Sequence, residues 1–504
     1  MFEPDFDAFA ATYMRSEPSL IATRLIADLE TPVSAFLKLS AGRDGNCFLL
    51  ESVEGGTTRG RYSMIGLDPD IIWRANGGRA EINCVALVDR EAFESCPEKP
   101  LDSLRALVRD SAITQDASLP PMAAGVFGYL GYDMVREIER LSPAKADPIG
   151  VPDAVMMRPT IMAVFDSVKD ELCIVTPVRP RPAASARAAY DAAVERLENI
   201  VQVLEGPLAH PGTADPMLLA EDPVSNTPEQ HFLDMVERAK EYVRAGDIFQ
   251  VVLSQRFTSA FTLPPFALYR ALRRVNPAPF LCYLEFGDFQ IVCSSPEILV
   301  RVRDGKVTIR PIAGTRWRGA TAVEDEGLAA DLLADEKERA EHLMLLDLGR
   351  NDVGRVAEIG SVNVTEQFAI ERYSHVMHIV SNVEGKLDSR FDVIDALAAG
   401  FPAGTVSGAP KVRAMEIIDE LEIDKRGPYG GCIGYFGASG EMDTCIVLRT
   451  SVVKDGKMHV QAGAGIVYDS DPAYEHRECV NKAKALFRAA EEAVRFATRA
   501  KRGQ

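Results

Sequence analysis

Apolar positions in the first part of the chain come in short runs that turn residues separate. Between residues 20 and 180 the runs include FLKLS, NCFLLESV, TIMAVFD and ELCIVTPV, with Gly, Asn, Asp or Pro between them. Runs of this length and composition are typical of β-strands. Residues 183–204 instead repeat apolar positions every three or four residues, which predicts a helix.

A proline-rich segment divides the sequence. Residues 206–228 carry five prolines and few periodic apolar positions. We therefore place a linker at 207–227, between an N-terminal domain (1–206) and a C-terminal domain (228–504). Thr227 resembles an N-cap that starts a helix at this boundary.

Strand patterns in the C-terminal part often follow one another directly, as in IFQVVLSQRF, KVTIRPIAG and CIVLRTSVV. Helical patterns lie near 330–348, 392–399, 410–420 and 473–497, the last of them behind a helix start at Asp471. Directly consecutive strands favour antiparallel pairing over regular strand–helix–strand units. The expected fold class is therefore α+β.

Composition and charge narrow the classes of function. The 504 residues are 47% hydrophobic and 26% charged, as in ordinary globular proteins, and their formal net charge is −18. A chain this acidic, without a block of Lys and Arg, is not expected to bind nucleic acid. An anionic small substrate would require Arg, Lys, helix ends or a metal to reverse the field locally.

Cysteine usage and hydropathy predict a cytoplasmic protein without membrane association. The nine cysteines are scattered and form no C-x-x-C pair, so their spacing indicates neither a zinc site nor a disulfide framework. We find no secretory signal and no apolar stretch of membrane-spanning length.

Two pairs of glutamates are the first candidates for chemistry. Glu338 and Glu341, and likewise Glu475 and Glu478, stand three residues apart in helical patterns, so each pair can direct two carboxylates to one point. If the pairs converge, four carboxylates require a cation, and all-oxygen ligation suits Mg²⁺. Solvated helix faces explain the same spacing and are the commoner case.

A glycine-rich loop leads into a helix in PAGTVSGAPKVRAMEII, residues 402–418. Its backbone N–H groups, with the hydroxyls of Thr405 and Ser407, would suit a carboxylate, although a plain loop before a helix explains it as well. The loop lacks the G-x-x-x-x-G-K-[ST] pattern of a nucleotide-binding P-loop.

Three further signals lie within strand patterns. Arg449 is a charge in CIVLRTSVV, and a buried guanidinium needs an anion unless it lies at an edge. Gly463 and Gly465 in QAGAGIV would let a ligand approach the backbone closely. His375 and His378 lie in an apolar segment, where a hydrogen-bonded core histidine is the usual explanation and acid–base chemistry the alternative.

In their order along the chain and in their residues, these segments resemble motifs of the chorismate-utilising enzymes, most closely of the anthranilate synthase component I family. The likeness is strong from about residue 228 to 490, through GDIFQVVLSQRF, SSPEILV, PIAGTRWRG, AEHLMLLDLGRND, VMHIVSNVEG, PAGTVSGAPKVRAMEIID, GPYGGCIGYF, CIVLRT, QAGAGIV and ECVNKAKA. The resemblance implies two packed antiparallel sheets flanked by helices. It also implies conversion of chorismate and ammonia to anthranilate and pyruvate.

The resemblance assigns a role to each matching residue. Glu341 and Glu478 would be the principal Mg²⁺ ligands, with Glu338 and Glu475 in support, and the metal would hold the ring carboxylate of chorismate. The other substrate contacts would come from Gly314, Thr315, Tyr429, Arg449, Gly463, Ala464, Gly465 and Lys482.

The resemblance also implies three catalytic residues. Glu297 would be the general acid that protonates the departing 4-hydroxyl as ammonia adds at C2, a role for which its pKa must be raised. His378 and Thr405 match residues linked to the second step, in which the C2 proton and the enolpyruvyl group leave.

Two positions separate the sequence from related enzymes. Aminodeoxychorismate synthases, the closest alternative, typically carry a lysine nucleophile where Ala313 stands here. Isochorismate and salicylate synthases typically carry a lysine base where this chain has Gln250. Ammonia is therefore the expected nucleophile. Because no cysteine lies in a G-x-C-x-G glutaminase motif, a separate glutamine amidotransferase subunit, and hence a hetero-oligomer, is expected.

The segments LLES and NPAPFLCY resemble the tryptophan feedback site of the family. Ser52, Pro279, Phe280 and Leu281 would form that allosteric pocket, although a strand end packed on a proline turn explains the same residues. A noncatalytic tryptophan-binding or partner-binding protein is the alternative of another class. The presence of Glu297 and of all four metal-site glutamates argues against it.

Overall fold

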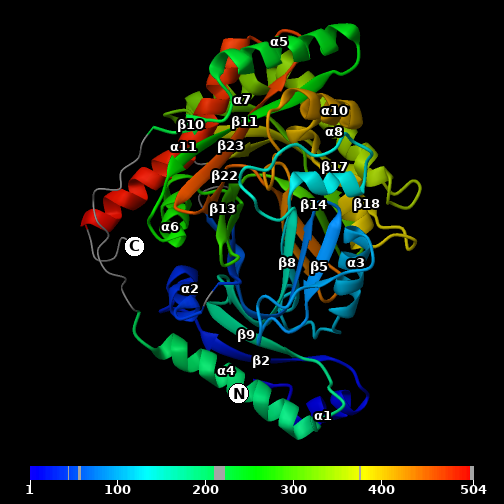
Figure 1. The fold of residues 1–504 in the computed structure, drawn as a ribbon, viewed down its shortest axis with the longest axis vertical. Coiled ribbons are helices and arrows are strands. Elements are labelled where there is room, and N and C mark those ends of the chain that lie inside the picture. Colours follow the sequence, from blue (N-terminus) through cyan, green and yellow to red (C-terminus); the bar gives the residue numbers. More distant parts are fainter. Residues whose placement is uncertain (44, 55–57, 209–221, 374–375, 500–504) are drawn as a thin grey trace.

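Two antiparallel β-sheets form the centre of the molecule (Figure 1). The structure is a computed structural model that describes residues 1–43, 45–54, 58–208, 222–373 and 376–499. The first sheet runs through β10 (Val224–Ser225), β11 (Gln250–Ala260), β23 (Lys457–Ile466), β22 (Thr450–Lys454), β13 (Phe289–Ser295), β12 (Phe280–Glu285), β3 (Cys47–Glu54), β4 (Thr58–Asn76), β8 (Ala154–Asp166), β9 (Glu171–Val178), β2 (Ser19–Ile26) and β1 (Phe2–Glu3). The short β19 (Gly408–Ala409) also pairs with β11.

The second sheet branches from the long strands β4 and β8. It continues through β7 (Gly125–Leu130), β20 (Cys432–Gly437), β21 (Met442–Ile446), β14 (Ile298–Arg303), β15 (Lys306–Ile309) and β18 (Val376–Lys386). β16 (Ile312–Trp317) pairs with the same edge of β18 as β15 does, and β17 (Asn363–Arg372) pairs with the other edge. At the other side, β5 (Arg79–Asn83) and β6 (Glu94–Ser95) extend β4.

Both halves of the chain contribute to each sheet. β3 pairs with β12, and β7 pairs with β20, so strands from the two sides of the predicted linker are hydrogen-bonded to each other. Residues 209–221, most of that linker, lie outside the described residues. The predicted boundary stays a prediction, but it does not divide the sheets.

Apolar side chains fill the space between the two sheets. The rings of Phe48, Phe127 and Tyr435 stack in series there, with centroids 4.8 and 5.4 Å apart. All six residues of β7 are buried, because helices cover the outer face of its sheet as well.

Helices cover the outer faces of the sheets. One outer core contains α1 (Phe6–Met14), α2 (Pro32–Ser40), α4 (Ala186–Glu205), α6 (Pro265–Val275) and α11 (Pro472–Arg499). A second outer core contains α3 (Pro100–Asp110), α5 (Glu229–Ala245), α8 (Glu336–Gly354), α9 (Val393–Gly400) and α10 (Lys411–Leu421), while α7 (Ala322–Ala334) packs on β16. The prediction of two packed antiparallel sheets flanked by helices is confirmed. No helix in the described part of the chain is both long and apolar enough to cross a bilayer.

The sequence patterns predicted the positions of the helices more accurately than the residues at which the helices begin and end. The pattern at 330–348 is two helices, because Asp335 ends α7 and caps α8 by accepting hydrogen bonds from the N–H groups of Lys337 and Glu338 at 3.0 and 3.2 Å. Asp471 caps α11 as expected. The predicted N-cap at Thr227 is wrong: Pro228 is the N-cap residue of α5, and the Thr227 hydroxyl donates to Asn226.

A buried ion pair joins the elements around one end of β11. Arg426 and Glu422 are 3% and 4% exposed, and the Arg426 Nε donates to Glu422 at 2.9 Å. Arg426 also donates to the carbonyl oxygens of Val406 and Val252, and Glu422 accepts from the N–H and hydroxyl of Ser254. This pair thus fixes β11, the end of α10 and the loop around Val406 to one another.

Replacing Glu422 with Gln should destabilise the protein strongly, because it leaves the Arg426 charge buried without its counter-ion. We expect the free energy of unfolding in urea to fall by about 3–5 kcal/mol. The control is Arg187→Ala, which removes an exposed pair with Asp191 and should change the free energy of unfolding by less than about 0.5 kcal/mol. Similar losses in the two variants would contradict the prediction.

Candidate active site

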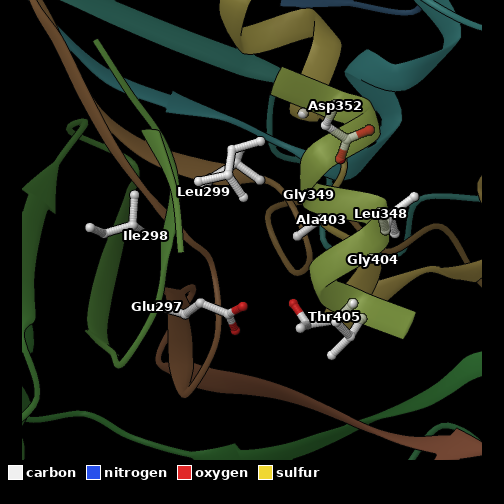
Figure 2. Close-up of a pocket in the computed structure, with 12 residues that line it drawn as sticks. Glu297, Ile298, Leu299, Leu348, Gly349, Asp352, Ala403, Gly404 and Thr405 are labelled. Atoms are coloured by element: carbon white, nitrogen blue, oxygen red, sulfur yellow. The ribbon is translucent and has the colours of Figure 1, made fainter. Parts of the chain in front are cut away.

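Glu297 lies in the turn between β13 and β14, and its carboxyl is buried. The residue is 6% exposed, and Figure 2 shows its carboxyl directed toward the Thr405 hydroxyl. Burial raises the pKa of Glu297 to about 8, against the opposing effects of Thr405, the Ile312 N–H and Arg449. The carboxyl therefore holds a proton at neutral pH, as a general acid must.

A pocket opens beside this carboxyl (Figure 2). It contains about 330 Å³ of space, its open mouth included, and is lined by residues 297–299, by one face of α8 and by the loop from Gly400 to Thr405. The Thr405 hydroxyl is buried and makes no hydrogen bond of normal geometry within the described residues. Because this hydroxyl lines the pocket and faces only the Glu297 carboxyl among the described residues, it is placed to contact a ligand in the pocket.

His378 on β18 has a defined tautomer. Its Nδ1 lies 2.9 Å from the carbonyl oxygen of Gly314 and 3.1 Å from the Thr315 hydroxyl. A carbonyl oxygen only accepts, so Nδ1 carries the hydrogen and Nε2 keeps its lone pair. Burial lowers the pKa of His378 to about 4, so the ring is neutral at physiological pH.

Gly314 connects this histidine to the glutamates of α8. The register between β16 and β18 shifts at Gly314, whose φ of +73° is in the left-handed region that favours glycine. A Cβ atom at this position would lie 3.1 Å from Glu338 Oε2. The bulge therefore brings the backbone that holds His378 next to a candidate metal ligand.

Arg449 is a partly buried cation without a carboxylate partner among the described residues. Its φ of 48° is rare for a residue other than glycine, and its carbonyl oxygen accepts from the Ser294 N–H at 3.2 Å. Its guanidinium makes no hydrogen bond or ion pair with the residues that the structure describes. Burial lowers the pKa of Arg449, while Tyr373 and Glu297 oppose this. Such a group is costly to bury unless an anion binds to it.

Two glycines of β23 let side chains approach its backbone. A Cβ atom on Gly463 would lie 2.7 Å from the Tyr429 hydroxyl, and one on Gly465 would lie 2.5 Å from Nε2 of Gln250. The Lys482 ammonium donates to the Gly463 carbonyl oxygen at 3.0 Å. Tyr429 and Lys482 thus both lie against Gly463 at the predicted carboxylate site, next to Ala464, which is fully buried.

The glycine-rich loop is not an open cradle for an anion. It forms η3 (Gly404–Val406) and then pairs with β11 through Gly408. The Ser407 hydroxyl is buried and donates to the Ala403 carbonyl oxygen at 2.8 Å, so it is used within the loop, in contrast to our expectation. The hydroxyl of Thr405 remains the candidate ligand-binding group of this segment.

The two glutamate pairs lie on α8 and α11, and contacts at the end of β11 and β23 connect them. Gln250 donates to Glu341 at 3.0 Å, and Lys482 forms an ion pair with Glu478 at 2.6 Å. Lys337 lies within electrostatic reach of both pairs: although burial opposes it, Asp469, Glu475 and Glu341 raise the Lys337 pKa.

Repulsion within each pair is consistent with a cation site. Burial raises the pKa of Glu338 and of Glu475, and the neighbouring Glu341 and Glu478 raise them further. Carboxylate oxygens are the ligands that Mg²⁺ prefers, so the donor set fits this ion. In the described residues, however, no three of these carboxylates have oxygens within 4.8 Å of one another, because protein groups such as Arg316 hold them. Ligation of Mg²⁺ stays a prediction.

Comparisons with known proteins agree with this geometry. The model of the chorismate binding enzyme family matches residues 46–488. Anthranilate synthase component 1 of Cereibacter sphaeroides is 57% identical over 500 residues, which are 99% of either chain. Anthranilate synthase component I from Streptococcus pneumoniae superposes with a TM-score of 0.74 at 38% identity, over 92% of this chain and 99% of that one. The chain belongs to the anthranilate synthase component 1 family of chorismate-binding enzymes.

A more distant chorismate-binding enzyme shares the fold alone. The menaquinone-specific isochorismate synthase from Escherichia coli is 19% identical and superposes with a TM-score of 0.70 over 96% of this chain and its own whole length.

In this chorismate-binding enzyme, the predicted regulatory residues lie on β3 and β12. Ser52 is the strand partner of Phe280, and the buried Leu281 is the partner of Glu51. Pro279 immediately precedes β12. The Glu51 carboxylate is itself buried and accepts hydrogen bonds from Tyr269 and Arg273, each at 2.6 Å. His375 lies outside the described residues, so the structure does not test a role for it.

Sequence reasoning missed the side chains that hold the candidate residues in place. Gln250 holds Glu341, and Arg316 holds Glu338 at 3.2 Å. The ring of Tyr373 packs edge-on against His378, with centroids 5.4 Å apart. Each of these residues lies in or next to a quoted motif, but their partners come from other elements and are not readable from spacing.

Replacing Glu297 with Gln should remove a pH-dependent loss of stability. The Glu297 pKa rises from 4.5 to about 8 on folding, so the unfolded chain releases this proton first. The stability contributed by the group is fully present below about pH 4.5 and is lost as the pH rises to about 8. Between pH 5 and 8.5, the free energy of unfolding of the wild type should fall relative to Glu297→Gln by up to about 4 kcal/mol. Parallel urea-unfolding curves for the two proteins would contradict this.

Proposed function

We propose that this chain converts chorismate and ammonia to anthranilate and pyruvate. The observation that carries the proposal is the protonated, buried Glu297 near the Arg449 guanidinium, which no described residue provides with an anion, in a chain 57% identical to an anthranilate synthase component 1. Chorismate supplies the complementary groups, since it carries two carboxylates and a 4-hydroxyl that needs a proton to leave.

Each group of the site has a role in this reaction. Arg449, Tyr429 and the backbone at Gly463–Gly465 would bind one carboxylate of chorismate, with Gly314 and Thr315 beside the ring. Glu341 and Glu478, with Glu338 and Glu475 in support, would hold Mg²⁺, which supplies positive charge for the other carboxylate.

Proton transfer is assigned to two residues. Glu297 would protonate the departing 4-hydroxyl as ammonia adds at C2. The neutral His378, whose Nε2 keeps its lone pair, supports a role in the second step, in which the C2 proton and the enolpyruvyl group leave. The Thr405 hydroxyl is directed at Glu297, and it would contact the substrate between Glu297 and His378.

Two neighbouring positions support ammonia as the nucleophile. Ala313 offers no group that could attack C2, which disfavours aminodeoxychorismate synthesis. Gln250 donates its amide hydrogen to Glu341 and cannot act as a base toward water.

The test is to incubate the purified chain with chorismate, Mg²⁺ and an ammonium salt. Equal amounts of fluorescent anthranilate and of pyruvate are expected. Glu297→Gln should retain its fold and lose about 100-fold or more in kcat, the usual contribution of a general acid. An aminated product without pyruvate would favour aminodeoxychorismate synthase, and no product would contradict both.

The metal proposal predicts that Glu341→Gln and Glu478→Gln lose about 100-fold or more in kcat/KM, because each removes a charged oxygen ligand with little change in volume. Calorimetric titration should show Mg²⁺ binding to the wild type that either substitution weakens. Glu336→Gln is the matched control, an exposed glutamate on the same helix. Unchanged dependence of turnover on Mg²⁺ in the two ligand variants would remove the assignment.

We propose that a separate glutamine amidotransferase subunit supplies ammonia in a hetero-oligomer, since no G-x-C-x-G motif surrounds a cysteine of this chain. The isolated chain should then use ammonium salts and not glutamine. Turnover with glutamine alone would contradict this. We expect the complex to be cytoplasmic.

Tryptophan is proposed as an inhibitor that binds at Ser52, Pro279, Phe280 and Leu281, where the pairing of β3 with β12 supports a shared pocket. Phe280→Ala should raise the tryptophan concentration needed for half-inhibition at least about 10-fold, the effect of losing one aromatic contact. Turnover without tryptophan should be unchanged. The control is Ile26→Ala, an exposed apolar residue outside the proposed pocket. Equal inhibition of the two variants would contradict the proposal.

A further inference from the structure

Three cysteines that are distant in the sequence meet between the two sheets. Cys282 and Cys293 are strand partners on β12 and β13 of the first sheet, and Cys445 comes from β21 of the second. Their sulfur atoms all lie within 4.8 Å of one another. The residues are 4%, 0% and 1% exposed, so this cluster is enclosed in the core. The spacing of these cysteines along the chain does not indicate a metal site.

The three sulfur ligands and their apolar surroundings determine which kind of metal ion the cluster could bind. Thiolates favour soft ions, and the surrounding core is apolar, so hard cations that need oxygen ligands or water are disfavoured. Within the described residues the cluster offers three thiol ligands, and no further Cys, His, Asp or Glu joins it as a fourth. Structural Zn²⁺ takes four ligands in a tetrahedron, whereas Cu(I) is satisfied by two or three sulfurs.

The bland explanation is that these cysteines are small apolar core residues. Free cysteine often plays that role, and several other cysteines of this chain are buried without thiol neighbours in a described cluster, such as Cys432 and Cys479. Packing alone does not require three sulfurs from three strands to converge. The convergence is what a ligand set for one ion requires.

We propose that Cys282, Cys293 and Cys445 form a binding site for one soft monovalent metal ion of the Cu(I) type. Each thiol that becomes a ligand forms a sulfur–metal bond and releases its proton to solvent, and no electron is transferred. The bound ion would connect β12 and β13 of the first sheet to β21 of the second. None of the three cysteines has a role in the proposed reaction, so this inference stands or falls separately from it.

The proposal is tested by titrating the full chain with Cu(I), without oxygen and in competition with a Cu(I) chelator. The Cys84→Ser background removes the exposed thiol. We expect one equivalent of Cu(I) per chain, three sulfur neighbours in X-ray absorption, and a raised melting temperature, because the ion joins two sheets. Cys293→Ala should weaken binding at least about 100-fold, since loss of a direct ligand exceeds the effect of second-shell changes. Cys432→Ala, a buried cysteine outside the cluster, should not.

Because the cluster is enclosed, Cu(I) is added both to the native protein and during refolding from urea. The proposal would be overturned if the protein retained no ion by both routes. Fewer than three sulfur neighbours, or equal affinity in Cys293→Ala and Cys432→Ala, would also overturn it. Circular dichroism verifies that each variant folds. If Cys293→Ala does not fold, Cys445→Ala provides the same comparison from the other sheet.

Discussion

The buried pair of Arg426 and Glu422 is the interaction on which the candidate site depends. A desolvated ion pair contributes little net stability by itself, but it tolerates very few geometries. Arg426 binds the carbonyl oxygens of Val252 and Val406, and its guanidinium lies over the ring of Tyr429, 5.5 Å from the centroid. Thr405 precedes Val406, and Gln250 lies two residues before Val252. One guanidinium thus helps to position three groups. These are Thr405, which faces the candidate acid, Gln250, which binds Glu341, and Tyr429, which lies against Gly463.

Burial also resolves the conflict between the charge of the chain and that of its proposed substrate. At −18 the protein should repel a dianion, yet the local field differs from the global one. Glu297 is neutral because its carboxyl is buried, and no residue that the structure describes supplies a counter-ion to Arg449. The glutamates of α8 and α11 would add to repulsion if they were bare, which is the physical reason to propose a cation among them.

The sequence allowed prediction of what depends on local periodicity and on motif chemistry. The helix behind Asp471 was predicted in this way, whereas Glu297 was named as the candidate acid from the resemblance of SSPEILV to the family. Expectations failed where a distant or unforeseen partner decided the outcome. Thr227 is not the N-cap because its hydroxyl binds Asn226, and Ser407 turns back to Ala403. The cysteine cluster could not be anticipated, since its members meet only when two sheets pack together.

The pairing of β12 with β13 brings the proposed regulatory pocket close to the candidate acid. Phe280 is the strand partner of Ser295, the last residue of β13, and Ser295 lies two residues before Glu297. The Ser295 hydroxyl accepts from the Glu297 N–H at 3.4 Å, so the turn that carries the acid is tied to the strand end beside the pocket. A ligand that shifts the backbone of Phe280 must therefore either break this pairing or move the backbone that carries Glu297. Coupling between the two sites then requires no long pathway, because one hydrogen-bonded ladder belongs to both.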